Sequence, residues 1–419
     1  MREMKDSGIE WVGTIPAHWS TMPNKYVMRK IKVINPTYNG ENILSLTVNG
    51  VIVRDLEAGG KMPSSFDGYQ ILYKGNLLMC LFDYDVTPRC IGLIKDSGVS
   101  SPAYSQFVLQ RGNDAAYFYY YYLMVDHTKA LLHRAKNLRH SFTEEQLGAI
   151  KVPVPPIAEQ ERIVDFLDSQ CSEIDAISAD IQKEIEILEQ YKRSVITEAV
   201  TKGLNPDVEM KDSGIGYIGM IPANWKVEKI KYHLRYRGTR NPGNAQVLSV
   251  YREYGVIPKD SRSDNHNVTS EDTSNYRYVR MGDFVINKMK AWQGSMAISE
   301  YDGVVSPAYY VYEFHDGVFE KKYFHYLLRN QMYAAEFLRV SGGIRVGQWD
   351  LSSTDFENTK VSIPTIKEQK EIAAYLDTKC KEIESAIADK KHQLEVLSAY
   401  KKSIIYEYVT GKKEVPNYG

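Results

Sequence analysis

The stretch PPIAEQERIVDFLDSQCSEID at 155–175 returns near the end of the chain as PTIKEQKEIAAYLDTKCKEIE at 364–384. In both copies a proline precedes a run with glutamates in its first turns and apolar residues at helical spacing. Proline is tolerated where a helix begins, and the helix macrodipole favours acidic side chains there. No proline or glycine follows up to residue 202 in the first copy or residue 410 in the second. The two stretches therefore predict long helices at 157–202 and 366–410.

Apolar residues recur at seven-residue intervals along both predicted helices, as they do in coiled coils. In the first helix we expect a buried row at Leu167, Ile174, Ile181, Leu188 and Val195, with an adjoining row at Ile163, Ile177 and Tyr191 that Gln170 and Glu184 interrupt. In the second helix the row is Leu376, Ile383, Leu397 and Ile404, interrupted by Lys390. One helix cannot bury such a row alone, so we expect the two helices to pack together.

The two stretches belong to a longer internal duplication. MKDSGI at 4–9 recurs letter for letter at 210–215, and WVGTIPAHW at 11–19 recurs as YIGMIPANW at 217–225. SPAY at 101–104 recurs at 306–309, and YKRSVITEAVT at 191–201 matches YKKSIIYEYVT at 400–410. The period is much longer than that of a solenoid and indicates a duplicated domain.

Two divergent bodies of mixed α and β pattern lie between the shared segments. Runs such as NILSLTV at 42–48, YQILYKGNLLMCLF at 69–82 and SQFVLQ at 105–110 predict strands, and residues 115–134 and 320–338 predict helices. We expect four parts: a first body with its opening at 1–156, a first long helix and linker at 157–209, a second body with its opening at 210–365, and a second long helix and tail at 366–419.

The composition predicts a globular cytoplasmic protein, with 43% hydrophobic and 25% charged residues. Four cysteines without C-x-x-C spacing make a disulfide scaffold or a structural zinc site unexpected. The net charge of −1 hides an uneven distribution. Residues 20–156 hold 15 basic against 11 acidic side chains, residues 226–365 hold 19 against 16, and residues 157–209 hold 5 against 13. The basic excess of the bodies is modest and does not by itself identify a nucleic-acid binder.

Three fragments resemble parts of catalytic motifs but lack the surroundings that the chemistry needs. NPTY at 35–38 has no glycine-rich cofactor loop beside it, PDVEMK at 206–211 lies in a linker, and DNHN at 264–267 lacks the fold signals of a histidine-metal nuclease. The sequence also contains no G-x-x-x-x-G-K-[S/T] phosphate loop. We therefore expect a non-catalytic chain without catalytic, cofactor-binding or metal-binding residues.

Taken together, these features resemble the DNA specificity (S) subunit of type I restriction-modification systems, over essentially the whole chain. The most specific element is the doubled, proline-led EQ-x-x-I-x-x-x-LD signature. It is carried by Pro156 (or Pro155), Glu159, Gln160, Ile163, Leu167 and Asp168, and again by Pro364, Glu368, Gln369, Ile372, Leu376 and Asp377. One departure is LRHSFTEEQL at 138–147, where many relatives have a turn with glycine and glutamine like GGIRVGQWDL at 342–351.

The resemblance implies an α+β fold: two duplicated α/β target recognition domains, joined and separated by two long helices packed as an antiparallel coiled coil. Each domain would read one half of a split site in double-stranded DNA, and two methyltransferase (M) and two restriction motor-nuclease (R) subunits would assemble with the chain, with no membrane involved. S-adenosylmethionine, ATP and magnesium would belong to the partner subunits. Two alternatives are a duplicated-domain interaction protein that binds a non-DNA partner, and a combined methylase-nuclease, which would need the missing motifs.

Candidate DNA-contacting residues lie at two corresponding places in each body. The second body offers Lys288, Lys290, Trp292 and Gln293 after an apolar run, and Arg345 and Gln348 after a Gly-Gly turn. The first body offers Tyr84 and Arg89 in the corresponding loop, and Arg139, His140 and Ser141 in the corresponding turn. Arg, Lys and Gln donors suit the edges of guanine and adenine. We expect the tyrosine-rich run at 117–123 to pack in a core and SPAY to form a shared turn.

Overall fold

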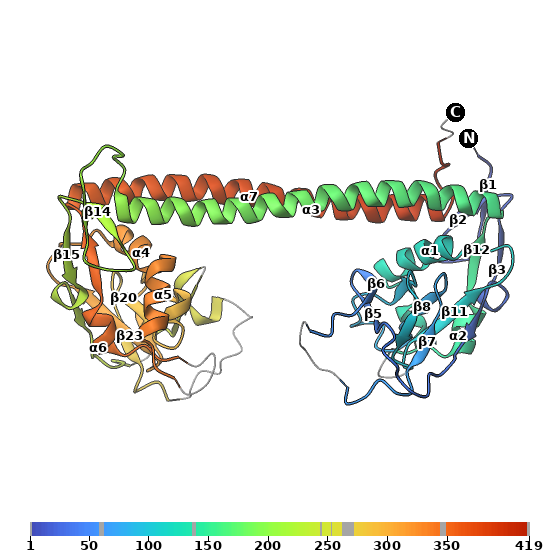
Figure 1. Cartoon of the computed structure of the whole chain (residues 1–419), viewed down its shortest axis with the longest axis horizontal. Helices are drawn as coiled ribbons and strands as arrows, with labels where there is room; N and C mark the ends of the chain where they lie inside the picture. The colour runs from blue at the N-terminus through green and yellow to red at the C-terminus, as the bar shows by residue number, and fades with distance from the viewer. Residues whose placement is uncertain are drawn as a thin grey trace. The chain divides into compact units, whose positions relative to one another are not determined.

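The computed structural model describes residues 2–57, 63–135, 140–243, 245–252, 254–261, 272–343 and 349–416. Its contacts divide the chain into two compact units. Unit 1 consists of Met1–Ile181 and His392–Gly419, and unit 2 consists of Gln182–Lys391. Each unit combines one body with parts of both long helices (Figure 1), so the units cut across the domain boundaries expected from the sequence.

The body of unit 1 is built on a four-stranded antiparallel sheet of order β4-β11-β8-β9. Its strands are β4 (Met28–Ile31), β11 (Ser105–Leu109), β8 (Leu77–Met79) and β9 (Ile91–Leu93). Further antiparallel pairs are β1 (Met4–Asp6) with β2 (Thr14–Pro16), β5 (Leu44–Thr47) with β6 (Gly50–Val53), β7 (Gln70–Leu72) with β10 (Gly98–Ser100), and β3 (Ser20–Pro23) with β12 (Lys151–Val154). Helix α1 (Ala115–His127) packs against β9, and α2 (Glu144–Ala149) precedes β12.

Unit 2 repeats this topology. Its four-stranded sheet has the order β16-β23-β20-β21, with β16 (Leu234–Tyr236), β23 (Tyr309–Phe314), β20 (Phe284–Asn287) and β21 (Met296–Ile298). The further pairs are β13 (Met210–Asp212) with β14 (Met220–Pro222), β17 (Leu248–Tyr251) with β18 (Gly255–Pro258), β19 (Arg277–Val279) with β22 (Gly303–Val305), and β15 (Lys226–Lys229) with β24 (Lys360–Ile363). Its helices are α4 (Lys321–Arg329), α5 (Gln331–Val340) and α6 (Ser353–Asn358).

The predicted elements of the bodies are largely confirmed. The three predicted strand runs contain β5, β7, β8 and β11, and the helix expected at 115–134 ends earlier, at His127, before a short 3-10 turn at Leu132–Arg134. The helix expected at 320–338 is divided at Asn330, whose side chain accepts a hydrogen bond from the Met332 amide and so begins α5. Most of the tyrosine-rich run is buried, as predicted, and both SPAY copies form the same turn, closed by Tyr104 N to Ser101 O and by Tyr309 N to Ser306 O.

The two long helices, α3 (Ile157–Lys202) and α7 (Ile366–Val409), confirm the predicted bounds almost to the residue. They run antiparallel in each unit. In unit 1 the Phe166 ring near the start of α3 lies 4.4 Å from the Tyr408 ring at the end of α7. In unit 2 Lys192, towards the end of α3, pairs with Glu384 of α7. Within the described ranges no helix is both long and apolar enough to cross a bilayer.

The adjoining predicted row of the α3 seam is confirmed only at Ile163, which is buried. Leu167, Ile174, Ile181 and Val195 are buried as expected and Leu188 is partly buried, but Ile177 and Tyr191 are 43% and 51% exposed. Cys171 and Ile185 are buried instead, one residue further along the helix. The expected row contains the polar residues Gln170 and Glu184. Exposing these polar side chains to solvent costs less free energy than exposing the apolar side chains of the neighbouring row would.

Candidate nucleic-acid interface

The glutamine of the doubled signature joins the start of each long helix to its body. Gln160 of α3 is fully buried; its Oε1 accepts a hydrogen bond from the Asp114 amide at 2.8 Å, and its Nε2 donates to the Pro155 carbonyl at 2.9 Å. In unit 2, Gln369 is fully buried and makes the same contacts with the Glu320 amide and the Pro364 carbonyl, at 2.8 and 3.0 Å. Asp114 and Glu320 are the N-caps of α1 and α4, so each glutamine fixes the first helix of its body.

The acidic residues of the signature bind aromatic side chains of the same body. The indole Nε1 of Trp19 donates to Glu159 at 2.6 Å, and that of Trp225 donates to Glu368 at 2.9 Å. The hydroxyls of Tyr120 and Tyr326 donate to Asp168 and Asp377 at 2.6 and 2.9 Å. The signature is therefore a structural clamp between body and helix, which explains why it is present twice.

The end of the other long helix completes each attachment. The Tyr117 hydroxyl of α1 donates to the Val409 carbonyl at the end of α7, at 2.8 Å. The Tyr323 hydroxyl of α4 lies 3.5 Å from the Val200 carbonyl near the end of α3. Each body is thus held by the beginning of one long helix and the end of the other.

The structure brings together, in each body, the loop and the turn that carry the candidate DNA-contacting residues. In unit 1 the Phe142 amide donates to the Leu81 carbonyl at 2.8 Å, and in unit 2 the Leu351 amide donates to the Lys288 carbonyl at 3.1 Å. Leu81 and Phe142 stand at the positions of Lys288 and Leu351 in the duplication. We call the loop and turn at 82–89 and 140–142 the first reading edge, and those at 288–293 and 349–351 the second reading edge.

Two candidates of the first reading edge are turned inwards. Tyr84 is only 5% exposed, its ring packs edge-on against Phe142, and burial raises the pKa of its hydroxyl. Arg89 is half-buried; it donates to the carbonyls of Val48 and Ile91, at 2.7 and 3.1 Å, and to the Tyr119 hydroxyl. Neither side chain is placed to read a base edge.

The other candidates of the first edge lie in the turn. His140 has a positive φ of 40°, and its imidazole lies 3.1 Å from the carboxylate of Asp85 in the facing loop. Ser141 is partly exposed beside it, and Arg139 lies outside the described residues. The surface that this edge presents therefore includes Asp85, His140 and Val86, whose side chain is 72% exposed.

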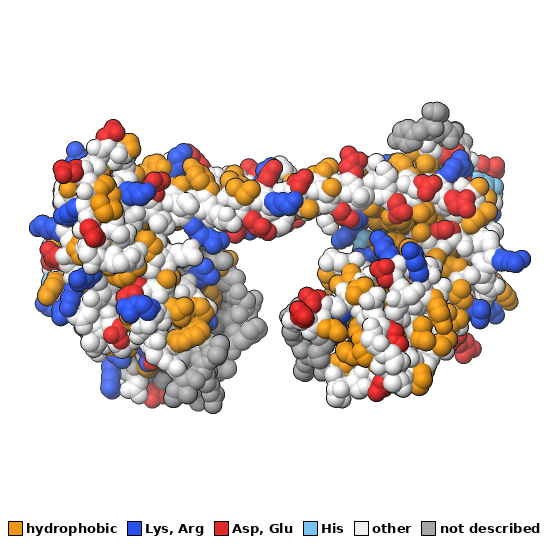
Figure 2. Space-filling model, in the orientation of Figure 1, with side chains coloured by type: hydrophobic (Ala, Val, Ile, Leu, Met, Phe, Trp, Pro, Cys, Tyr) orange, Lys and Arg blue, Asp and Glu red, His pale blue; other side chains and the backbone are white. Residues whose placement is uncertain are grey.

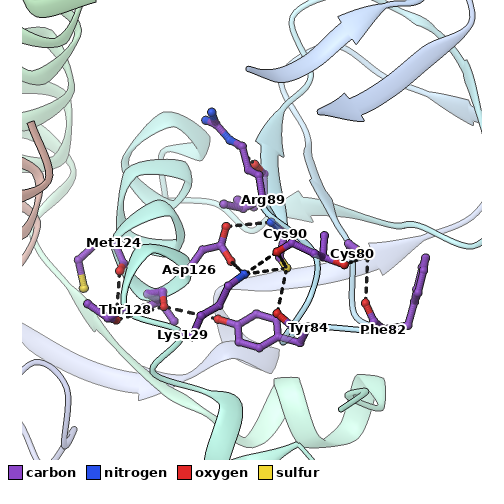
Figure 3. A network of polar contacts seen from close by, with 12 residues as sticks. Cys80, Phe82, Tyr84, Arg89, Cys90, Met124, Asp126, Thr128 and Lys129 are labelled. Carbon is purple, nitrogen blue, oxygen red and sulfur yellow. Dashed lines mark hydrogen bonds and ion pairs between the residues drawn. The ribbon is translucent and has the colours of Figure 1, made fainter. Parts of the chain in front are cut away.

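A buried charge network anchors the loop of the first reading edge (Figure 3). The ammonium group of Lys129 donates to Asp126 at 2.7 Å and to the Thr87 carbonyl at 2.8 Å, and it lies over the Tyr84 ring. The other oxygen of Asp126 accepts a hydrogen bond from the Cys90 amide at 2.8 Å. Burial raises the pKa of the Cys90 thiol, so Cys90 serves the network through its backbone and not as a nucleophile. The network ties both ends of the loop to the end of α1.

The second reading edge is basic and aromatic. Lys288 pairs with Asp350 at 3.0 Å, Lys290 is exposed, and Gln293 is partly exposed. Trp292 is partly exposed and meets Trp349 edge-on, with ring centroids 4.9 Å apart. These four candidates lie together as expected, whereas Arg345 and Gln348 lie outside the described residues.

Next to this edge is a cation-aromatic surface that the sequence analysis missed. The Arg277 guanidinium lies over the Tyr236 ring at 5.2 Å, and the Tyr236 ring meets that of Tyr310 at 6.2 Å. Burial raises the pKa of Tyr310, and the positive charge of Lys288 partly offsets this. The segments LRYRGTR at 234–240 and YRYVR at 276–280 alternate arginine and tyrosine, and this alternation could have identified the surface.

An arginine fastens the tip of a hairpin in each body, but from different positions. In unit 1 Arg89, just before β9, donates to the Val48 carbonyl at the tip of β5–β6. In unit 2 Arg329 of α4 donates to the Arg252 carbonyl, which is the equivalent position of the β17–β18 hairpin. His325 accepts a hydrogen bond from Arg329 at 2.9 Å and occupies the place of Tyr119, which Arg89 contacts. The two bodies therefore make an equivalent hydrogen bond to the hairpin tip, but from arginines at positions that do not correspond in the duplication.

Within the described ranges, no group of three or more His, Cys, Asp or Glu side chains is arranged to hold a metal ion.

The type I restriction modification DNA specificity domain matches residues 65–187 and 223–395, once in each copy of the duplication. The MjaVIII specificity subunit of Methanocaldococcus jannaschii is 27% identical over 289 residues, which are 64% of this chain and 63% of that protein. The putative MjaX specificity subunit of the same organism is 28% identical over 302 residues, which are 68% of this chain and 64% of that protein. The chain thus spans somewhat less than two thirds of the length of these relatives.

Two solved structures share the fold over nearly the whole chain. A chain from a study of complex assembly and conformational transition of the type I R-M system has a TM-score of 0.68 at 14% identity, covering 95% of this chain and 99% of that one. The HsdS subunit from Thermoanaerobacter tengcongensis has a TM-score of 0.50 at 15% identity, covering 95% and 98%. The likeness confirms the expected fold class. With a family match in both copies of the duplication, this chain belongs to the type I restriction-modification DNA specificity family.

Proposed function

We propose that this chain is a non-catalytic subunit that recognises a split site in double-stranded DNA and directs partner methyltransferase and restriction subunits to it. The observation that carries the proposal is the pair of reading edges: one equivalent backbone hydrogen bond holds each, and each presents different side chains. The first presents Asp85, His140 and Val86, and the second presents Lys290, Trp292 and Gln293. Two domains that read different half-sites need the same backbone geometry to approach the DNA and different side chains to contact the bases.

The long helices support two methyltransferase subunits as partners. Ile187 and Tyr191 lie one turn apart on α3 and are 63% and 51% exposed. Their equivalents on α7, Val396 and Tyr400, are 54% and 52% exposed. Apolar side chains are visible among the charged ones along the helices (Figure 2). Two matched apolar patches on one chain fit two copies of the same partner, each burying one patch.

The assembled complex would divide the chemistry among its subunits. The methyltransferase subunits would bring S-adenosylmethionine, and two restriction subunits would bring ATP and magnesium. This chain would act in the cytoplasm, where it would recognise the DNA sequence at which the complex works.

Long-read sequencing of methylated DNA, from cells that express the chain with its methyltransferase, tests the recognition. We expect one methylated motif with two specified halves around an unspecified spacer. Replacing residues 20–150 with the body of a relative should change one half only. A motif that changes in both halves, or the absence of any methylated motif from an assembled complex, would refute the proposal and favour a non-DNA partner.

Native mass spectrometry tests the number of methyltransferase subunits. Tyr191→Glu and Tyr400→Glu should each reduce the complex from two methyltransferase subunits to one, because a carboxylate would be buried in one interface. Gln182→Glu and Lys391→Glu are matched controls at exposed positions on the opposite side of the same helices. Loss of both subunits in either single variant would contradict two separate docking patches.

A further inference from the structure

A polar cleft of about 790 Å³ lies in unit 1 where the body meets the two long helices. Its walls are the tip of the β5–β6 hairpin at 48–52, one face of α1, and residues of α3 and α7. Arg89 closes the cleft between the hairpin and α1, because it bonds to the carbonyl of Val48 and the hydroxyl of Tyr119. Figure 2 shows basic side chains gathered where this body meets the helices.

The cleft carries more positive than negative charge. Its carboxylates are both engaged: Asp168 accepts the Tyr120 hydroxyl, and Asp175 pairs with Lys401 at 2.6 Å. Lys95 and Lys402 also line the cleft and are exposed. Across the described part of the chain, neither has a carboxylate within ion-pairing distance, and two ammonium groups are thus left for a ligand.

His127 lines the cleft, and its pKa is affected by the same positive charges. The side chain of His127 is exposed at the cleft, and its pKa is lowered below 6.5, first by partial desolvation in the cleft wall and then by the charges of Lys402, Arg89 and Lys401, against the opposing charge of Asp126. His127 is therefore neutral at pH 7. An anion held between these cations would weaken their effect on the imidazole, so the pKa of His127 should rise on binding.

We propose that this cleft binds a phosphate group of the DNA backbone, held by the ammonium groups of Lys95 and Lys402. Lysine ammonium groups are mobile point charges that suit phosphate, and contacts of this kind orient a protein on DNA without reading its sequence. Ser172, Ser398 and Asn49 line the same cleft and can donate further hydrogen bonds to phosphate oxygens. The inference rests on the proposed DNA-binding function and adds a positioning contact outside the reading edges.

The salt dependence of DNA binding by the complex with its methyltransferase tests the proposal. Lys95→Gln and Lys402→Gln should each reduce the slope of log K against log salt by about 0.9 and weaken binding about fivefold at 0.15 M salt, on target and unrelated duplexes alike. Lys151→Gln is the matched control, since Lys151 is exposed on β12 and does not line the cleft. The methylated motif should stay unchanged, which separates this contact from base recognition. If both lysine variants keep the wild-type slope, the proposal is wrong.

The imidazole of His127, followed by NMR in the complex, separates two sources of phosphate. A 20-base-pair duplex without the target site should raise the pKa of His127, and Lys402→Gln should reduce that rise. If inorganic phosphate raises the pKa but the duplex does not, the cleft holds free anions and the backbone proposal fails. A His127 pKa that responds to neither probe would also overturn it.

Discussion

The ammonium group of Lys390 lies 2.5 Å from the carboxylate of Glu184, although Lys390 occupies the seam position of α7 that holds the buried Ile181 in α3. Lys390 is the residue that interrupts the apolar row of its helix, and its partner lies on the opposite helix. The equivalent pairs Lys192 with Glu384 and Lys401 with Asp175 also join the helices within their units. Charge pairs across a seam specify alignment more than they add stability, since exposed pairs contribute about 0–1 kcal/mol.

The first prediction concerns this interruption. Lys390→Ile should raise the free energy of unfolding by about 1 kcal/mol, because an isoleucine would bury apolar surface where a lysine cannot. Urea unfolding of the full chain, followed by circular dichroism, measures the change. Lys391→Ile at the neighbouring exposed position is the control and should change little. An equal gain in both variants would show that the seam position has no special role.

The second prediction concerns the signature glutamines. Gln160→Leu or Gln369→Leu should lower the free energy of unfolding by about 2–4 kcal/mol, because a buried amide and buried carbonyls would lose their partners. Gln170→Leu, at a partly exposed position of the same helix, tests whether any glutamine-to-leucine change on α3 has this effect. We expect under about 1 kcal/mol for Gln170→Leu, because no buried backbone group depends on a surface glutamine. A comparable loss at Gln170 would argue against the clamp.

The helices could be predicted from the sequence because proline, the absence of helix breakers and a seven-residue period act locally. Individual loop side chains could not, because distant residues decide their orientation. Tyr84 and Arg89 stand in the expected loop, but Lys129, Phe142 and Tyr119 draw them inwards. By contrast, the loop and the turn were correctly matched between the bodies, since the duplication preserves the backbone frame.

The third prediction concerns the two fastening arginines. Arg89→Ala should make the amides of the β5–β6 hairpin exchange with deuterium roughly tenfold faster, because hydrogen bonds from a charged donor contribute about 1.5–3 kcal/mol. Arg329→Ala should do the same to the β17–β18 hairpin. Arg89→Lys should not restore protection, since lysine lacks the planar fork that reaches two acceptors.

Exposed arginines at Arg29 and Arg235 provide matched controls in the same two bodies. Unchanged exchange in Arg89→Ala, together with altered base preference at one position of the methylated motif, would identify Arg89 as a base reader after all.

The fourth prediction concerns pH. The pKa of His325 is lowered from 6.5 to about 3, first by burial and then by Arg329. The unfolded chain therefore binds a proton that the folded chain excludes, and stability falls as the pH drops below about 6.5. His325→Gln keeps an acceptor for Arg329 but does not titrate, so its free energy of unfolding should fall less between pH 7 and pH 5. His392→Gln, at an exposed site, should follow the wild type.

The last prediction tests whether the long helices set the separation of the half-sites. Each body is held by the start of one helix and the end of the other, so lengthening one helix alone would break an attachment. The insertion must therefore be made in both. Duplicating Asp180–Lys183 in α3 and the equivalent Asp389–His392 in α7 adds about 6 Å of rise and slightly more than one turn to each helix. The apolar rows then return almost to phase.

Because duplex DNA rises about 3.4 Å per base pair, the spacer of the methylated motif should lengthen by roughly two base pairs while both half-sites stay the same. Two residues inserted in each helix should instead impair assembly, since they turn the following row by about 200° and expose it. Long-read methylation sequencing reads out the spacer, and native mass spectrometry confirms that the complex has formed. A complex that assembles and methylates with the four-residue insertions but keeps the original spacer would show that the helices do not determine the distance, and that the DNA itself adapts to it.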